Sequence, residues 1–95
     1  MLDIKEAKST FNRAFENKID LIVNAQIDAI DKEVRKAVAG GFASCDVREI
    51  NEAHGRKTRD EVIARLQSMG YSVNFFNESS RDADYRFFRV EGWAN

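Results

Sequence analysis

The chain has 95 residues, of which 43% are hydrophobic, enough for the core of one domain but not of two. Fifteen basic residues against sixteen acidic ones give a net charge of −1, which argues against a wholly basic nucleic-acid-binding protein. The single cysteine excludes an intramolecular disulfide and fits a reducing compartment. No signal peptide is recognisable and no apolar run approaches the ~20 residues of a membrane span. We therefore expect a cytoplasmic protein that has no membrane partner.

The first 39 residues contain neither proline nor glycine, and residues 3 to 38 are predicted to form one long helix. Asp3 followed by Glu6 is typical of a helix start. Gly40 and Gly41 are typical of a helix end. Residues 1–39 are thus expected to be an oligomerisation helix, and residues 42–93 the remainder of a single domain.

Two apolar seams run along this helix, about a third of a turn apart. The first comprises Ile4, Ala7, Phe11, Phe15, Ile22, Ala25 and Ala29, and the second Ile19, Val23, Ile27, Ile30, Val34 and Ala37. A helix ~54 Å long overhangs a compact domain whose radius of gyration is ~12 Å. We expect the overhang to pack against a second copy of the chain. The expected oligomer interface is Phe11, Phe15, Ile22, Val23, Ile27 and Ile30. A break near residues 16–18, which folds the first part back as a hairpin, is the alternative.

Residues 42–50 alternate loosely and predict a strand, although residues 46–54 are also compatible with a helix. Thr58 with Glu61 predicts a capping box that opens a second helix, which ends at Gly70. Residues 71–77 and 85–91 predict two further strands. The expected fold is therefore α+β: a long helix, then a two-layer β-α-β-β unit with a three-stranded sheet and helices on one face. The β-α-β part predicts a parallel crossover, and the last two strands predict an antiparallel hairpin.

Strand alternation places aromatic residues on both faces of this sheet, although the helices readily cover one face. The expected ligand-binding residues are on the last hairpin: Arg86, Arg89, Tyr85, Phe87 and Phe76. Arginine and aromatic side chains together stack on and neutralise a nucleotide-like ligand. The alternative interpretation is that the aromatic residues fill the core and a subunit interface.

A basic cluster surrounds the second helix: Arg48, Arg56, Lys57, Arg59 and Arg65. Arg56, Lys57 and Arg59 lie at its predicted start, where backbone N–H groups also favour anions. The alternative is an ordinary solvated surface. One Cys45 and one His54 do not make a zinc site, and a cysteine within a strand is typically a small buried hydrophobe. We therefore expect no metal, no cofactor and no enzymatic activity.

The order of features along the chain resembles that of many small phage-encoded proteins of unassigned role. These features are a long helix, a glycine break, a short strand, the motif Leu66-x3-Gly70-Tyr71-x-Val73 and a hairpin that ends at Trp93. This resemblance implies a viral origin and a non-enzymatic task in the host-cell cytoplasm. Such tasks include assembly into a particle, binding of a host protein and sequestration of a nucleotide signal.

The segment from Asp46 to Val90 resembles winged-helix regulators. In that resemblance residues 47–55 supply the first helix of a helix-turn-helix, residues 58–69 the recognition helix and residues 71–91 the wing. It implies a DNA-binding regulator that dimerises through the N-terminal helix and contacts DNA through Arg56, Lys57 and Arg59. His54 departs from the pattern, because the turn requires an apolar residue there.

The sequence thus predicts a non-enzymatic homo-oligomer that binds a partner protein or a small anionic ligand, or that serves as an assembly module. A DNA-binding regulator is the alternative function.

Overall fold

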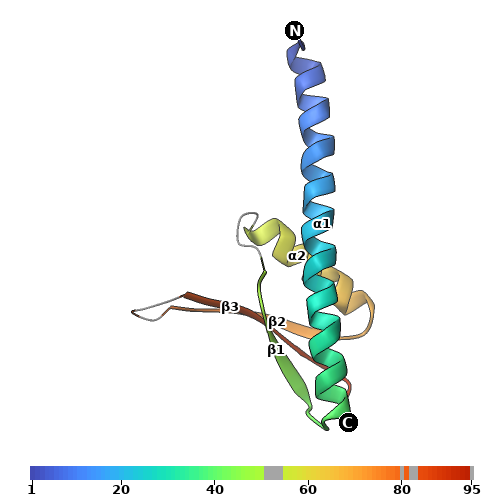
Figure 1. Cartoon of the computed structure of the whole chain (residues 1–95), viewed down its shortest axis with the longest axis vertical. Helices are drawn as coiled ribbons and strands as arrows, with labels where there is room; N and C mark the ends of the chain where they lie inside the picture. The colour runs from blue at the N-terminus through green and yellow to red at the C-terminus, as the bar shows by residue number, and fades with distance from the viewer. Residues whose placement is uncertain (51–54, 80, 82–83, 95) are drawn as a thin grey trace.

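A computed structural model of the chain describes residues 1–50, 55–79, 81 and 84–94 (Figure 1). Its elements follow the order α1 (Ile4–Ala39), β1 (Ser44–Arg48), α2 (Gly55–Ser68), β2 (Ser72–Ser79) and β3 (Asp84–Glu91). This is the α+β class that the sequence predicts. Among the described residues no helix is both long enough and apolar enough to cross a membrane.

The long helix α1 is continuous over 36 residues and extends well beyond the rest of the chain (Figure 1). The Asp3 side chain caps its start by accepting a hydrogen bond from the Glu6 backbone N–H at 2.8 Å. No break occurs near residues 16–18, so the folded-back hairpin is wrong. The molecule measures 58 × 36 × 16 Å, with the amino-terminal part of α1 standing clear of the sheet (Figure 1).

The sheet has the order β1-β3-β2, and both neighbours run antiparallel to β3. The strands β1 and β2 therefore run parallel to each other, as the β-α-β pattern predicts, but β3 lies between them. The predicted hairpin of the last two strands is confirmed, with Phe76 opposite Phe87 and Val73 opposite Val90. The predicted strand over residues 42–50 is shorter, at Ser44–Arg48.

The helix α2 begins three residues earlier than the capping box predicts, at Gly55 instead of Thr58. Thr58 consequently lies within the helix, where it is buried and its hydroxyl has no hydrogen-bond partner. The predicted end is confirmed. Gly70 has φ +96°, a conformation that favours glycine, and Tyr71 N–H donates to the Leu66 carbonyl at 3.1 Å.

The core lies between the two helices and one face of the sheet. Phe88 and Val90 of β3, Val62 of α2 and Val23 of α1 are fully buried in it. From α1 the core takes most of the second apolar seam and one polar residue: Ile19, Val23, Gln26, Ile30, Val34 and Ala37. The second seam is therefore the inward face of α1, which leaves much of the first seam to be covered by something else.

The winged-helix resemblance requires a helix where the structure has β1. Asp46, Val47 and Arg48 pair with Arg89, Phe88 and Phe87 of β3 in an antiparallel ladder. The fold implied by that resemblance is therefore wrong over residues 46–48. Its remaining positions at 51–54, including His54, lie outside the described residues.

Candidate functional site

The face of the sheet that points away from the helices carries a cluster of aromatic and arginine side chains. Phe76 of β2 and Phe87 of β3 are cross-strand partners whose rings stack 5.3 Å apart, with an interplanar angle of 20°. Their alternation with buried Phe88 and Val73 fixes them on the face opposite to the core. We define the open sheet face as Asp46, Arg48, Phe76, Tyr85, Phe87 and Arg89.

Arg89 holds the centre of the open sheet face. Its guanidinium donates two hydrogen bonds to the Asp46 carboxylate, at 2.8 and 3.2 Å, from the neighbouring strand β1. It also lies 4.9 Å from the ring centre of Phe76 and 5.8 Å from that of Phe87. The hydrogen bond with Asp46 and the charge of Asp46 raise the pKa of Arg89 above its usual value. Because the carboxylate of Asp46 already neutralises the guanidinium, Arg89 is better suited to stack on aromatic rings than to bind a free anion.

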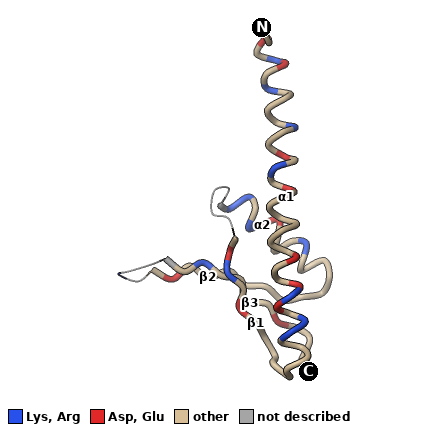
Figure 2. Tube along the Cα trace, in the orientation of Figure 1, with Lys and Arg blue, Asp and Glu red and all other residues tan. Residues whose placement is uncertain are grey.

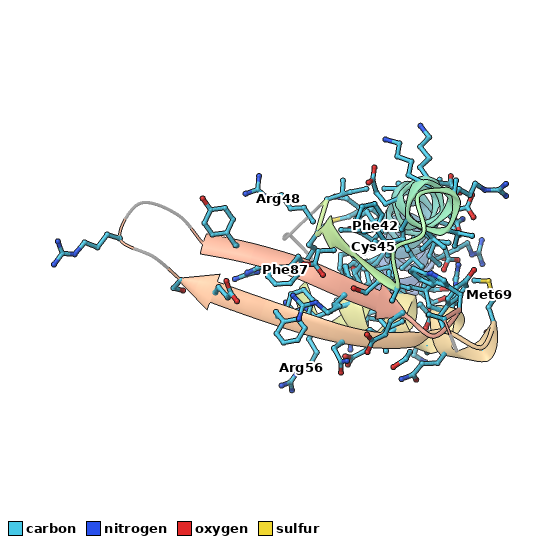
Figure 3. All side chains as sticks on the ribbon, turned by 90° about the horizontal axis from the view of Figure 1, so that it is seen from below. Phe42, Cys45, Arg48, Arg56, Met69 and Phe87 are labelled. Carbon is cyan, nitrogen blue, oxygen red and sulfur yellow. The ribbon has the colours of Figure 1, made fainter. Side chains whose placement is uncertain are left out.

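Arg48 lies at the edge of this face, where its guanidinium is 5.2 Å from the ring centre of Tyr85. Figure 3 shows Arg48 beside the hairpin of β2 and β3, which carries Phe87 and extends away from the helices. The sequence pattern groups Arg48 with the basic cluster around the second helix. The strand register, which pairs Arg48 with Phe87, is what brings it here.

Arg86 does not belong to the open sheet face, contrary to its predicted role beside Arg89. Arg86 is two residues from Phe88 along β3 and so lies on the same face of the sheet, the face towards the core. Its Nε is buried without a hydrogen-bond partner. Of the five residues predicted to bind a ligand, four therefore share the open sheet face: Phe76, Tyr85, Phe87 and Arg89. Arg86 lies on the opposite face.

The three basic residues of the predicted anion site at the start of α2 do not lie together in the structure. Arg59 donates to Glu49 at 3.3 Å and lies 4.0 Å from the ring centre of Phe75. Lys57 instead lies 5.1 Å from the ring centre of Phe15 on α1, while Arg56 is exposed. The three side chains thus have different surroundings and do not form one site for a phosphate.

A second uncovered surface runs along α1. Positions spaced alternately by three and four residues form what we call the heptad stripe: Ile4, Ala7, Phe11, Ala14, Lys18, Leu21 and Ala25. Six of these residues are exposed and Ala7 is half-exposed. Ile4, Phe11 and Leu21 are 70%, 64% and 70% exposed, which is high for large apolar side chains. Charged residues are interspersed along the whole helix (Figure 2).

The predicted oligomer interface is only partly available. Phe11 is exposed and stacks on half-buried Phe15 at 5.7 Å. Ile22 and Ile27 are half-buried. Val23 and Ile30 are buried in the core of their own chain, so their assignment to the interface is wrong. Leu21 was missed, although it continues the spacing of Phe11 and Ala14.

Cys45 is half-buried on β1, facing the core side of the sheet. Burial, and then the charges of Glu33 and Asp46, raise the pKa of the thiol above its usual value of 9.0. A thiol that stays protonated near neutral pH is a poor nucleophile. Among the described residues no cluster of three or more His, Cys, Asp or Glu side chains is placed to hold a metal ion.

Three shallow pockets on the described surface have volumes of about 150, 240 and 280 Å³. The most apolar of them lies between α1 and α2, lined by Val34, Leu66, Met69 and Tyr71. Ligand sites for small molecules usually span ~300–1,000 Å³. The three pockets are therefore smaller than a usual small-molecule site.

Comparisons with protein-family models, with curated proteins and with solved structures found no match.

Proposed function

We propose that this protein is a non-enzymatic, homo-oligomeric assembly module. Copies of the chain associate through the heptad stripe of α1, and the open sheet face contacts a partner protein. The observation that carries the proposal is the heptad stripe, a regularly spaced and largely exposed line of side chains that is apolar except at Lys18. The viral origin and the cytoplasmic location remain predictions from the sequence.

The heptad spacing supports self-association because a period of 3.5 residues keeps one line of side chains facing a partner helix. The stripe continues for three heptads, from Ile4 to Ala25, along a helix that contains no proline or glycine. An apolar line of this length on a free helix is typical of a helix–helix interface, because monomers rarely expose extended apolar patches.

The energy of such pairing is moderate. Burying one Leu, Ile or Phe side chain contributes about 1.5–3 kcal/mol. Ile4, Phe11 and Leu21 from each of two copies then contribute on the order of 10 kcal/mol. Association itself costs about 4–15 kcal/mol. We therefore expect a dimer that dissociates at low concentration, and its test must cover a range of concentrations.

Sedimentation velocity of the full chain, from about 1 to about 100 μM, tests the proposal. We expect the weight-average mass to rise towards twice 10.9 kDa for the unmodified chain. The double variant Phe11→Ser, Leu21→Ser is expected to stay monomeric. Val38→Ser is the matched control, because Val38 is also apolar, 52% exposed and on α1, but lies outside the stripe. A monomeric unmodified chain, or a double variant that still associates, overturns the proposal.

The chemistry of the open sheet face supports a protein partner. Phenylalanine, tyrosine and arginine are enriched at the centres of protein interfaces, and Asp46 compensates the charge of Arg89. Phe87→Ala and Arg48→Ala are expected to abolish binding once a partner has been captured, while leaving the sedimentation of the chain unchanged.

A small anionic, nucleotide-like ligand is the second candidate for this face, favoured by exposed Arg48 beside Tyr85. Titration calorimetry with ADP as the probe tests it. Heat of binding that disappears in Arg48→Gln supports this candidate, and the absence of heat with the unmodified chain rejects it for that ligand.

A further inference from the structure

The heptad stripe contains charged residues whose positions bear on how two copies meet. Lys18 is one of the seven residues of the heptad stripe. Asp28 continues the same spacing beyond Ala25, and we call the line from Ile4 to Asp28 the seam of the pair. Both side chains lie on exposed parts of α1. A charge within an otherwise apolar seam is costly unless the partner helix places a suitable group opposite it, and such charges are known to set orientation.

We propose that two copies of α1 pair in the antiparallel orientation, with the two-fold axis close to Glu16. This inference rests on the proposed self-association and specifies its geometry. Seam residues then pair as follows: Phe11 with Leu21 of the partner subunit, Ala7 with Ala25 of the partner subunit, Ala14 with Lys18 of the partner subunit, and Ile4 with Asp28 of the partner subunit.

In a parallel pair every seam residue would meet its own copy. Lys18 would face Lys18 of the partner subunit, and Asp28 would face Asp28 of the partner subunit. Like charges directly opposite each other in a seam repel, and the low dielectric of the interface strengthens that repulsion. The parallel pair therefore places two repulsive contacts in the seam that runs from Ile4 to Asp28.

In the antiparallel pair both charges have favourable surroundings. The Lys18 stem lies along the small side chain of Ala14 of the partner subunit, and its ammonium group reaches solvent past it. Asp28 lies opposite Ile4 of the partner subunit, in the first turn of the partner helix, where the positive end of the helix dipole and Lys5 of the partner subunit favour a carboxylate. The antiparallel pair thus avoids the two directly opposed like-charge contacts of the parallel pair, and this difference selects it.

The antiparallel pair also explains why α1 is so long. The folded part of the chain packs on α1 from Phe15 towards Ala37, which leaves the part of the helix before Phe15 largely exposed. In the antiparallel pair each free half lies against the half of the partner helix that carries the folded part. Each exposed Phe11 then covers an exposed Leu21, and the two sheets lie at opposite ends of the dimer.

Pulsed electron-electron resonance on spin-labelled protein tests the orientation. The labels are attached to cysteines introduced in a Cys45→Ala background, which removes the single native cysteine. Lys5→Cys and Asn17→Cys place labels on exposed positions outside the seam, far from and near to the proposed two-fold axis respectively.

The antiparallel pair separates the labels at position 5 by ~33 Å or more along the helix axes. The labels at position 17 remain within ~20 Å of each other in either orientation. A long distance at position 5 with a short one at position 17 is the expected result. Short distances at both positions overturn the antiparallel orientation but leave self-association intact. No dipolar coupling at either position means that α1 does not pair, and the proposed function fails as well.

Discussion

The side-chain amide of Gln26 donates a hydrogen bond from Nε2 to the main-chain carbonyl of Arg48 at 3.1 Å. Its Oε1 also accepts a hydrogen bond from the backbone N–H of Ile50. One buried side chain thus satisfies the Arg48 carbonyl at the end of β1 and the Ile50 N–H just after it. Main-chain groups at the edge of a sheet otherwise need a strand or water. Gln26 therefore attaches the long helix to the edge strand at a defined position.

Replacing Gln26 by Leu is expected to destabilise the chain by about 1–2 kcal/mol, because it removes two hydrogen bonds and leaves the part-buried Arg48 carbonyl and Ile50 N–H without their partner. The free energy of unfolding, from urea titration followed by circular dichroism, measures the effect. Gln67→Leu is the matched control, since Gln67 is an exposed glutamine on α2, and its change should stay within about 0.5 kcal/mol. Equal effects of the two substitutions would contradict this role of Gln26.

Neighbouring phenylalanines on β3 are expected to respond differently to truncation. Phe88 is fully buried and contacts Phe75 edge-to-face at 5.2 Å, so Phe88→Ala should cost about 3–5 kcal/mol. Phe87 on the open sheet face is half-buried, and Phe87→Ala should cost about 1 kcal/mol, mostly from its stacking on Phe76. Urea titration of both variants checks this, and a larger loss for Phe87 would mean that the faces are assigned wrongly.

Arg59 is expected to be a structural residue, because it pairs with Glu49, whose side chain is 4% exposed. Arg59→Met leaves that carboxylate buried without its cation and should destabilise the chain by about 3 kcal/mol. The double variant Glu49→Gln, Arg59→Met should recover much of the loss, as a double-mutant cycle of unfolding free energies would show. Additive losses in the cycle would mean that the two residues do not interact.

The DNA-binding alternative depends on the same cluster at the start of α2. Arg56→Glu combined with Lys57→Glu leaves the Arg59–Glu49 pair intact and reverses two charges. We expect the unmodified chain and this variant to show the same negligible affinity for duplex DNA in fluorescence anisotropy at low salt. Salt-dependent binding by the unmodified chain that the variant lacks would support the alternative function.

Cys45 is expected to react slowly with thiol reagents at neutral pH, because burial, Glu33 and Asp46 raise its pKa. The folded state therefore holds the thiol proton more tightly than the unfolded state does. The resulting stability is fully present below the usual pKa of 9.0 and is lost as the pH rises above that value. The pH profile of iodoacetamide alkylation should shift to lower pH in Glu33→Gln, whereas an unchanged profile would remove Glu33 as a cause.

The sequence predicts the elements well, because their signals are local. The period of α1, its Asp3 cap and the Gly70 stop each act within a few residues. The capping box at Thr58 misleads because Gly55, Arg56 and Lys57 can extend the same helix by one turn. Which α1 seam is buried depends on where the sheet packs, and both seams are apolar around residues 19–30. Periodicity therefore assigned Val23 and Ile30 to the wrong surface.

The candidate site depends on contacts that are distant in the sequence. Strand alternation was sufficient to place Phe87 and Arg89 on one face of β3, whereas the register of the hairpin is what brings Phe76 of β2 to the same face. The pairing of Asp46 with Arg89 and of Arg48 with Phe87 joins positions about forty residues apart through the register of β1 and β3. That register was not deducible from the sequence, so neither the neutralisation of Arg89 nor the role of Arg48 was predicted.

Native mass spectrometry of the unmodified full chain, at about 50 μM and in volatile buffer, tests self-association most directly. We expect a principal species at twice the monomer mass of 10.9 kDa, and we expect this species to be lost in the variant Phe11→Ser, Leu21→Ser. A monomer across the whole accessible concentration range would mean that the heptad stripe does not pair with a second copy of the chain, and self-association would be rejected.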